Sequence, residues 1–238
     1  MSRLLALESS GRTPSVALLR GREVVAEAQA PPGRSGAEGL LPAVDAVLRQ
    51  ADLELEAVDA FAVSIGPGSF TGLRVGVATL KGLAFGSEKP VAAVSSLAAL
   101  AHAAASGADV AGSLPIVALL DARRGEVYAG GWQLSGAAGV APVSPPEGVY
   151  TPQELVAALP PGGVLLVGEG IAICGEQVRE LAGAEVQLGP VCEPRACDVG
   201  ILGYWKLAAG SALRAEEIVP RYVRRAEAEV QRTGHRFE

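Results

Sequence analysis

A short pattern occurs twice in the chain, about half the chain length apart. It consists of an apolar run, a carboxylate, a turn and a returning apolar run. The first copy is Leu5-Ala6-Leu7-Glu8 followed by 15–20, and the second is Ala118-Leu119-Leu120-Asp121 followed by 126–134. Each copy predicts a buried strand that ends in an acid and pairs with an antiparallel strand. We therefore expect two related halves, each of which begins with a hairpin.

Helices and strands alternate after each predicted hairpin, which predicts an α/β fold with mixed sheets. The chain has 238 residues, of which 49% are apolar, so two small domains can each bury a core. The Gly-rich, polar stretch 106–113 is the expected linker. The predicted domains are therefore 1–106 and 113–238, and the last helix and tail are allowed to pack back on the first domain.

Charge and hydropathy exclude several classes of protein. The formal net charge is −6, which repels phosphate backbones, so we expect contact with nucleic acid only through a partner. No apolar run reaches the roughly 18 residues that a membrane span needs. The three cysteines lack CxxC spacing and are typical of reduced thiols. These features predict a cytoplasmic protein without membrane contact.

The glycine-rich loop Gly66–Gly76 joins a predicted strand to a predicted helix and is the most informative stretch of the chain. Such a loop either presents backbone N–H groups to an anion or forms a tight turn in which Ser69 or Thr71 caps the helix. It has neither the Gly-Lys-Ser/Thr of a P-loop nor the spacing of a dinucleotide fingerprint. Arg74 in the first helical turn opposes the helix dipole, which indicates a nearby carboxylate, phosphate or partner surface.

The helix that follows the loop contains three glycines, Gly72, Gly76 and Gly82. Each glycine costs about 1 kcal/mol relative to alanine inside a helix. Their presence therefore predicts that another backbone comes very close. That neighbour is either a sheet of the same chain or a second subunit.

The two carboxylates at the strand ends have two interpretations. If the halves face each other, Glu8 and Asp121 point into a common cleft, where they could hold a hydrated magnesium ion on a nucleotide. Alternatively, each carboxylate organises its own turn, Asp121 by accepting hydrogen bonds from backbone N–H groups of Ala122–Gly125. The sequence leaves both interpretations open.

The usual catalytic combinations are missing from the sequence. The two histidines, His102 and His235, lie far apart, which excludes an HExxH motif and a histidine-based metal site. There is no Gly-x-Ser-x-Gly elbow, and Cys174 has no basic neighbour in sequence to lower its pKa. We therefore predict no catalytic residue and no metal ligand.

Four stretches of the chain form a distinctive set: Leu7–Ser10 with Ser15–Leu18, the loop Gly66–Gly76, Asp121–Tyr128 and Pro220–Arg224. Together these stretches resemble the TsaB family, also called YeaZ. The resemblance implies the actin-like, Hsp70-like ATPase fold with two related α/β domains. The chain departs from the family pattern in two places. Many members have Asp at the position of Glu8, and many have a histidine within the stretch that corresponds to 36–38.

The resemblance also implies a function and partners. Members of the family are non-catalytic partners of the paralogue TsaD, with the ATPase TsaE, in making N6-threonylcarbamoyladenosine beside the anticodon of ANN-decoding tRNAs. The resemblance implies that helices over 37–51 and 73–85 bind TsaD and that the isolated chain forms a homodimer. It also implies that the chain contacts tRNA only through the complex. No cofactor of its own is implied, and ATP or ADP with magnesium belongs to the complex with TsaD and TsaE. On this basis we expect Gly76→Leu to leave the chain folded but to abolish binding to TsaD.

Two other functions stay open. One is a nucleotide-dependent phosphotransferase or ATPase that uses the two carboxylates around magnesium, and the weaker one is a peptidase-like protein. The candidate residues for contact with a nucleotide or a partner come from the loop, the helix and the two hairpins. They are Glu8, Ser9, Ser10, Gly66, Gly68, Ser69, Thr71, Gly72, Arg74, Gly76, Asp121, Arg123 and Glu126.

Overall fold

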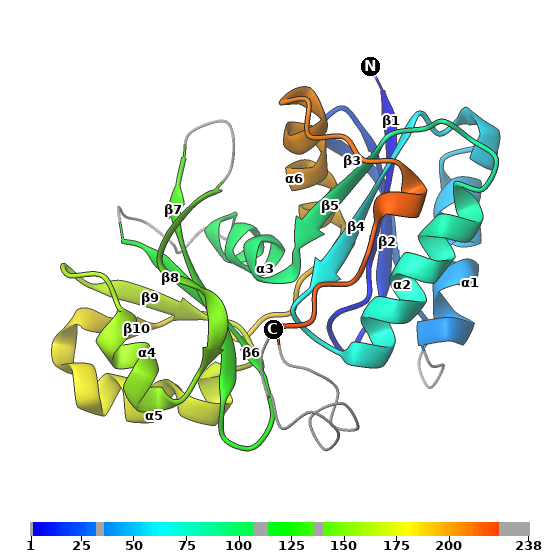
Figure 1. Ribbon diagram of the computed structural model, residues 1–238. Helices are drawn as coiled ribbons and strands as arrows, with labels where there is room; N and C mark the ends of the chain where they lie inside the picture. The colour runs from blue at the N-terminus through cyan, green and yellow to red at the C-terminus, as the bar shows by residue number, and fades with distance from the viewer. Residues whose placement is uncertain (1, 32–35, 107–113, 136–139, 224–238) are drawn as a thin grey trace. The chain divides into compact units, whose positions relative to one another are not determined.

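The computed structural model describes residues 2–31, 36–106, 114–135 and 140–223. Internal contacts divide the chain into two compact units, Met1–Ala99 with Pro194–Arg221 and Leu100–Glu193 with Tyr222–Glu238. Each unit contains one five-stranded sheet (Figure 1). None of the helices within the described ranges is both long and apolar enough to cross a membrane.

The first unit is a mixed sheet with the strand order β3-β2-β1-β4-β5. β1 pairs antiparallel with β2 and parallel with β4, which in turn pairs parallel with β5. α1 and α2 cover one face of this sheet and α6 covers the other (Figure 1). The elements are β1 (Arg3–Glu8), β2 (Ser15–Arg20), β3 (Glu23–Gln29), α1 (Gly36–Gln50), β4 (Ala60–Gly66), α2 (Phe70–Leu83), β5 (Val91–Ser95) and α6 (Ala196–Ala208).

The second unit repeats this arrangement. Its sheet has the order β8-β7-β6-β9-β10, with antiparallel pairs at β6–β7 and β7–β8 and parallel pairs at β6–β9 and β9–β10. The elements are β6 (Ile116–Asp121), β7 (Val127–Leu134), β8 (Val140–Tyr150), α4 (Pro152–Ala158), β9 (Val164–Val167), α5 (Ile171–Ala182) and β10 (Val186–Leu188). The shared strand order confirms the two related α/β halves that the repeated strand, acid and hairpin predict.

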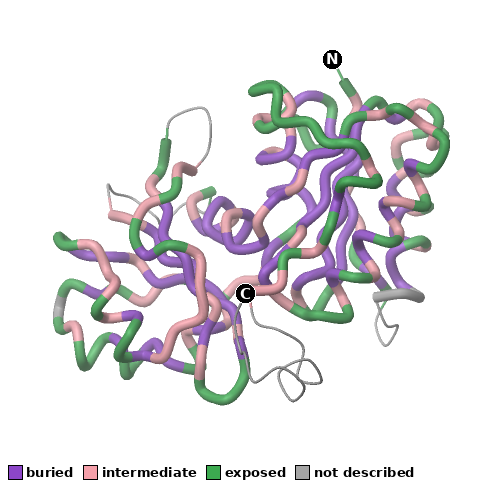
Figure 2. The backbone as a smooth tube through the Cα atoms, in the orientation of Figure 1, coloured by how far each residue is buried: buried purple, intermediate pink, exposed green. Residues whose placement is uncertain are grey.

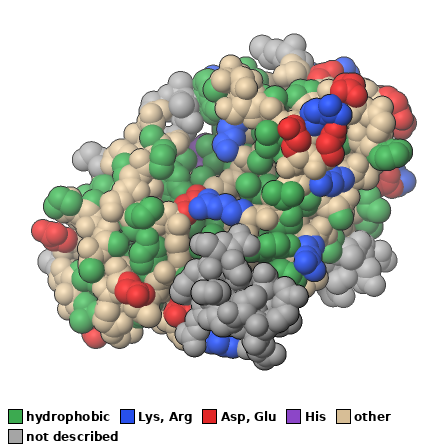
Figure 3. All heavy atoms as spheres, viewed as in Figure 1, with side chains coloured by type: hydrophobic (Ala, Val, Ile, Leu, Met, Phe, Trp, Pro, Cys, Tyr) green, Lys and Arg blue, Asp and Glu red, His purple; other side chains and the backbone are tan. Residues whose placement is uncertain are grey.

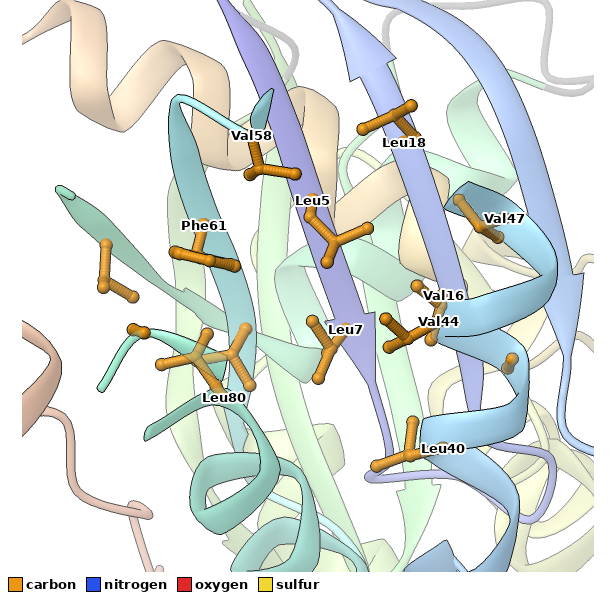
Figure 4. Packing of buried hydrophobic residues seen from close by; sticks show 14 of the residues in the cluster. Leu5, Leu7, Val16, Leu18, Leu40, Val44, Val47, Val58, Phe61 and Leu80 are labelled. Carbon is orange, nitrogen blue, oxygen red and sulfur yellow. The ribbon is translucent and has the colours of Figure 1, made fainter. Parts of the chain in front are cut away.

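Successive side chains of β1 point to opposite faces of the first sheet. Leu5 and Leu7 belong to the cluster that packs under α1 and α2, together with Leu40 and Leu80 (Figure 4). Leu4 and Ala6 face α6, because a Cβ built on Gly200 or Gly203 of that helix would touch them. Figure 2 shows long buried stretches in the central strands, which are β1, β2 and β4 in the first unit and β6 in the second. Burial on both faces explains why β1 is a nearly unbroken apolar run.

Several local predictions are confirmed and one strand is missed. Ser69 is the N-cap of α2, and Thr151 and Glu154 form a capping box at the start of α4. The sequence does not predict β8, whose three prolines argue against a strand. β8 lies at the edge of its sheet, where a missing N–H is tolerated.

The last helix returns to the first unit, where α6 packs on β1, β2, β4 and β5. α3 (Ser96–Ala105) spans the point at which the chain passes from one unit to the other. Of the expected linker 106–113, residues 107–113 lie outside the described residues. The domain limits 1–106 and 113–238 stay a prediction.

Candidate functional site

Glu8 is a fully buried carboxylic acid at the carboxyl end of β1. Its Oε1 accepts hydrogen bonds from the backbone N–H and the hydroxyl of Ser10, each over 2.5 Å. Its Oε2 has no hydrogen-bond partner in the described part of the chain. Burial raises the pKa of Glu8, and hydrogen bonds from Ser10 and Ser64 offset this rise only in part. The Oε2 atom of Glu8 is therefore buried away from water, and no hydrogen bond replaces the water that it loses.

The turn after Glu8 packs directly on the glycine-rich loop. The backbone N–H of Ser69 donates to the carbonyl of Ser10 over 2.9 Å, and the hydroxyl of Ser9 donates to the carbonyl of Gly72, also over 2.9 Å. A Cβ at Gly68 would lie 2.7 Å from the Ser10 backbone oxygen. The β1–β2 turn and the loop thus form one packed joint within the first unit.

This joint also explains two of the three helix glycines. A Cβ at Gly72 would lie 2.0 Å from the Ser9 carbonyl oxygen, and a Cβ at Gly76 would lie 2.1 Å from the Ser9 hydroxyl oxygen. A Cβ at Gly82 would meet nothing within 4 Å. The expectation that Gly76→Leu leaves the fold intact is therefore wrong, because its close neighbour is a turn of the same chain. Gly82 is the helix glycine with open space beside it.

Two amides of the loop are bonded within the protein. The N–H of Ser69 bonds to the β1–β2 turn, and the N–H of Gly72 donates to the Ser69 hydroxyl over 3.2 Å. Of the two interpretations of Gly66–Gly76, the capped tight turn is the one that the hydrogen bonds support. Thr71 and Arg74 are exposed, and the Arg74 guanidinium lies 4.2 Å from the centroid of the Phe70 ring.

The C-terminal motif reaches the same joint. The N–H of Arg221 donates to the carbonyl of Ile65 over 2.7 Å, and a Cβ at Gly66 would lie 2.6 Å from the Arg221 oxygen. Because Gly66 has φ +118°, no other residue fits there without strain. Three of the four stretches that carry the family resemblance therefore meet at one edge of the first sheet. Sequence reasoning did not connect Arg221 with this loop.

Asp121 occupies the equivalent position in the second unit and organises its own turn. Its Oδ1 accepts the backbone N–H of Arg123 over 2.7 Å, and its Oδ2 pairs with the Arg123 side chain over 3.1 Å. The Glu126 N–H donates to the Arg123 carbonyl over 3.1 Å and closes the turn. These bonds agree with the second interpretation of Asp121. A common cleft for Glu8 and Asp121 stays a prediction, since each lies in its own unit.

Two of the three cysteines, Cys174 and Cys197, are buried thiols. Burial raises the pKa of Cys174 to about 11 and also raises that of Cys197, so both side chains stay protonated thiols at neutral pH. Within the residues that the structure describes, no three His, Cys, Asp or Glu side chains gather to hold a metal ion.

Glu8→Gln is expected to make the protein more stable at pH 7. Because burial raises the folded-state pKa above its ordinary value of 4.5, the stability that Glu8 contributes is present below pH 4.5 and is lost as pH rises. The gain from Glu8→Gln should therefore shrink as pH falls toward 4.5, which urea unfolding between pH 4 and 7 measures. The control is Glu154→Gln, because the capping box lowers the pKa of Glu154 and its effect should have the opposite pH dependence. If Glu8→Gln raised the free energy of unfolding by the same amount at every pH, the raised pKa of Glu8 would be contradicted.

Sequence comparisons relate the chain to a family of known proteins. The family model described as "TsaD: tRNA N6-adenosine threonylcarbamoyltransferase" matches residues 32–231. The tRNA threonylcarbamoyladenosine biosynthesis protein TsaB of Bacillus subtilis is 32% identical over 96% of each chain. The protein of the same name from Escherichia coli is 30% identical over 93% of this chain and 94% of that protein.

Two solved structures from Pseudomonas aeruginosa have the same fold. YeaZ is 33% identical, with a TM-score of 0.77 over 93% of this chain and all of that one. An uncharacterized protein with similarity to peptidase YEAZ is 34% identical, with a TM-score of 0.79 over 94% of this chain and all of that one. These likenesses and the two repeated sheets confirm the fold class expected from the sequence, the actin-like fold. Similarity in sequence and structure over nearly the full chain shows that it belongs to the TsaB (YeaZ) family.

Proposed function

We propose that this chain is a non-catalytic subunit that binds and activates TsaD in the N6-threonylcarbamoyladenosine modification of ANN-decoding tRNAs, beside the anticodon. The observation that carries the proposal is similarity over nearly the full length to proteins named for threonylcarbamoyladenosine biosynthesis. The bonds of the Ser69 and Gly72 amides within the chain make the loop part of a packed joint, which supports a role as a scaffold.

The exposed side of α1 and α2 is the surface that we propose for TsaD. On α2 it contains Ala78 and Gly82, small residues that let another backbone approach, and just after the end of α2 it contains Phe85, which is 90% exposed. On α1 it includes Leu41, which is 55% exposed. Both of these apolar side chains can bury exposed area against a partner. Two copies of the chain would use the same surface as a homodimer when TsaD is absent.

Gly82→Leu is expected to abolish co-purification with TsaD while the chain stays folded. A Cβ at position 82 meets nothing within 4 Å, so the larger side chain is tolerated by the monomer but occupies the space left for a partner helix. Pull-down of tagged TsaD measures the effect, and circular dichroism checks the fold. The control is Gln177→Leu, which adds the same side chain to an exposed position of α5 in the second unit. If tagged TsaD captured the Gly82→Leu variant as well as the unaltered chain, the exposed side of α1 and α2 would be excluded as the binding surface for TsaD.

The same proposal says where the nucleotide and the tRNA bind. We assign ATP or ADP with magnesium to the complex with TsaD and TsaE, and tRNA to the assembled complex in the cytoplasm. The rival function is an ATPase centred on Glu8 and Asp121. Calorimetry of the isolated chain with Mg-ATP separates the two, since the scaffold predicts no heat of binding at millimolar nucleotide.

A further inference from the structure

The net charge of the chain lies in one of its two units. The first unit, residues 1–99 with 194–221, contains thirteen acidic and thirteen basic residues, whereas the second contains thirteen acidic and seven basic ones. The whole net charge of −6 therefore belongs to the second unit. An acidic surface attracts basic groups and repels the phosphates of nucleic acid, so charge selects the kind of partner that this unit can bind.

α4 and α5 form a helical layer in the second unit, as α1 and α2 do in the first. They pack on one face of their sheet through a cluster that contains Leu155 of α4 and Cys174 and Val178 of α5 (Figure 1). α5 follows β9 as α2 follows β4, and β9 and β4 hold the same place in the two strand orders. α5 is therefore the counterpart of α2.

The two counterpart helices carry opposite charge. α2 contains two basic residues, Arg74 and Lys81, and no acidic one. α5 contains Glu176, Arg179 and Glu180, and the short segments at its two ends, 168–170 and 183–185, add two acids and no base. A charged partner surface that suits one of these helices is disfavoured at the other. The repeat therefore gives the chain two helix surfaces that fit different partners.

The exposed face of α5 combines apolar side chains with acids. Ile173, Gln177 and Leu181 recur at four-residue spacing and so lie along one stripe of the helix, where Ile173 is 42% exposed and Leu181 52%. Glu180 lies in the last turn, where a negative charge opposes the helix dipole. Neither Glu180 nor Glu185 makes an ion pair with any residue that the structure describes. Figure 3 shows exposed hydrophobic and acidic side chains on the face of the second unit that is in view.

We propose that the exposed face of α5 binds a basic amphipathic helix of a protein partner other than TsaD, an inference that goes beyond the proposed function. The stripe from Ile173 to Leu181 is about 12 Å long, or roughly two helical turns, at the rise of an α-helix. A facing helix with apolar side chains at four-residue spacing matches such a stripe. Lysine or arginine beside those side chains would lie against Glu180 and Glu185 and offset their charge at the end of α5.

The test uses a fluorescein-labelled helical peptide of leucine, alanine and lysine, with the leucines at four-residue spacing. Fluorescence anisotropy with the full-length chain should show binding of this peptide, and no binding of the same peptide with glutamate in place of lysine. Ile173→Ser/Leu181→Ser should lower the affinity by about tenfold or more, because apolar area is no longer buried. Glu180→Gln/Glu185→Gln should lower the affinity at low salt and weaken its dependence on salt.

The matched controls make the same kinds of change in the first unit. Val24→Ser/Val25→Ser removes two apolar side chains of β3 that are 39% and 41% exposed. Glu23→Gln/Glu54→Gln removes two exposed acids. Both controls should bind the lysine peptide as the unaltered chain does. Circular dichroism checks that every variant is folded.

Several results would overturn the proposal. They are failure of the unaltered chain to bind the lysine peptide, equal binding of the glutamate peptide, unchanged affinity in the α5 variants, and an equal loss of affinity in the controls. Loss of TsaD in pull-down from Ile173→Ser/Leu181→Ser would assign this face to TsaD instead, and loss of self-association in sedimentation would assign it to a second copy of the chain. Gly82→Leu, which tests the proposed function, should bind the lysine peptide normally, so the two proposals can fail separately.

Discussion

Gly76→Leu is expected to lower the free energy of unfolding by about 3 kcal/mol or more, since overfilling a packed site costs 1 to 3 kcal/mol and sometimes exceeds this. The first atom of the new side chain would lie 2.1 Å from the Ser9 hydroxyl oxygen and 3.3 Å from its Cβ. The remaining atoms enter a buried layer between α2 and the sheet, with Val63 on the far side. Ser9 would also lose its hydrogen bond to Gly72, which fixes the β1–β2 turn on the helix. Urea unfolding measures the loss.

Gly82→Leu is the matched control because it makes the same change on the same helix. Position 82 is exposed and open, and leucine is about 0.7 to 1 kcal/mol better than glycine inside a helix. The control should therefore unfold at a higher urea concentration than the unaltered chain, and Gly76→Leu at a much lower one. Equal stability of the two variants would show that the turn does not press on α2 at Gly76.

The helix glycines show where sequence reasoning stops. Glycine at 72, 76 and 82 correctly indicates a close neighbour for the first two, but a local pattern does not say which neighbour it is. The answer depends on the β1–β2 turn, more than 60 residues earlier in the chain. Gly82 has the same helical context and no close neighbour. Only the packed structure separates the two kinds of position.

The fold is more predictable than the site for a physical reason. Apolar alternation and strand-ending acids are local signals, and they predict both sheets and the repeat. The strand β8 is missed because Pro142, Pro145 and Pro146 oppose a strand locally, while its edge position makes their missing N–H groups tolerable. The contact between Arg221 and Gly66 is missed because no local pattern links the tail to the loop. Local sequence patterns do not predict which residues of the site are brought together only by tertiary contacts.

Omission of this chain is expected to abolish tRNA modification in a reconstituted system. TsaD, TsaE and the enzyme that supplies threonylcarbamoyl-adenylate would be present in every reaction. If the chain activates TsaD by even about 1.4 kcal/mol of transition-state free energy, the rate changes tenfold. The Gly82→Leu variant should fail like the omission, because it folds but lacks the proposed contact with TsaD. The Gln177→Leu variant should restore the full rate.

The most direct test of the account is the initial rate of threonylcarbamoyl transfer to tRNA with and without this chain. A non-catalytic activating subunit should leave transfer at background when it is absent, give full transfer when the unaltered chain is added, and give no transfer without TsaD. Transfer at an undiminished rate without the chain, or transfer by the chain alone, would contradict its role as a non-catalytic activating subunit.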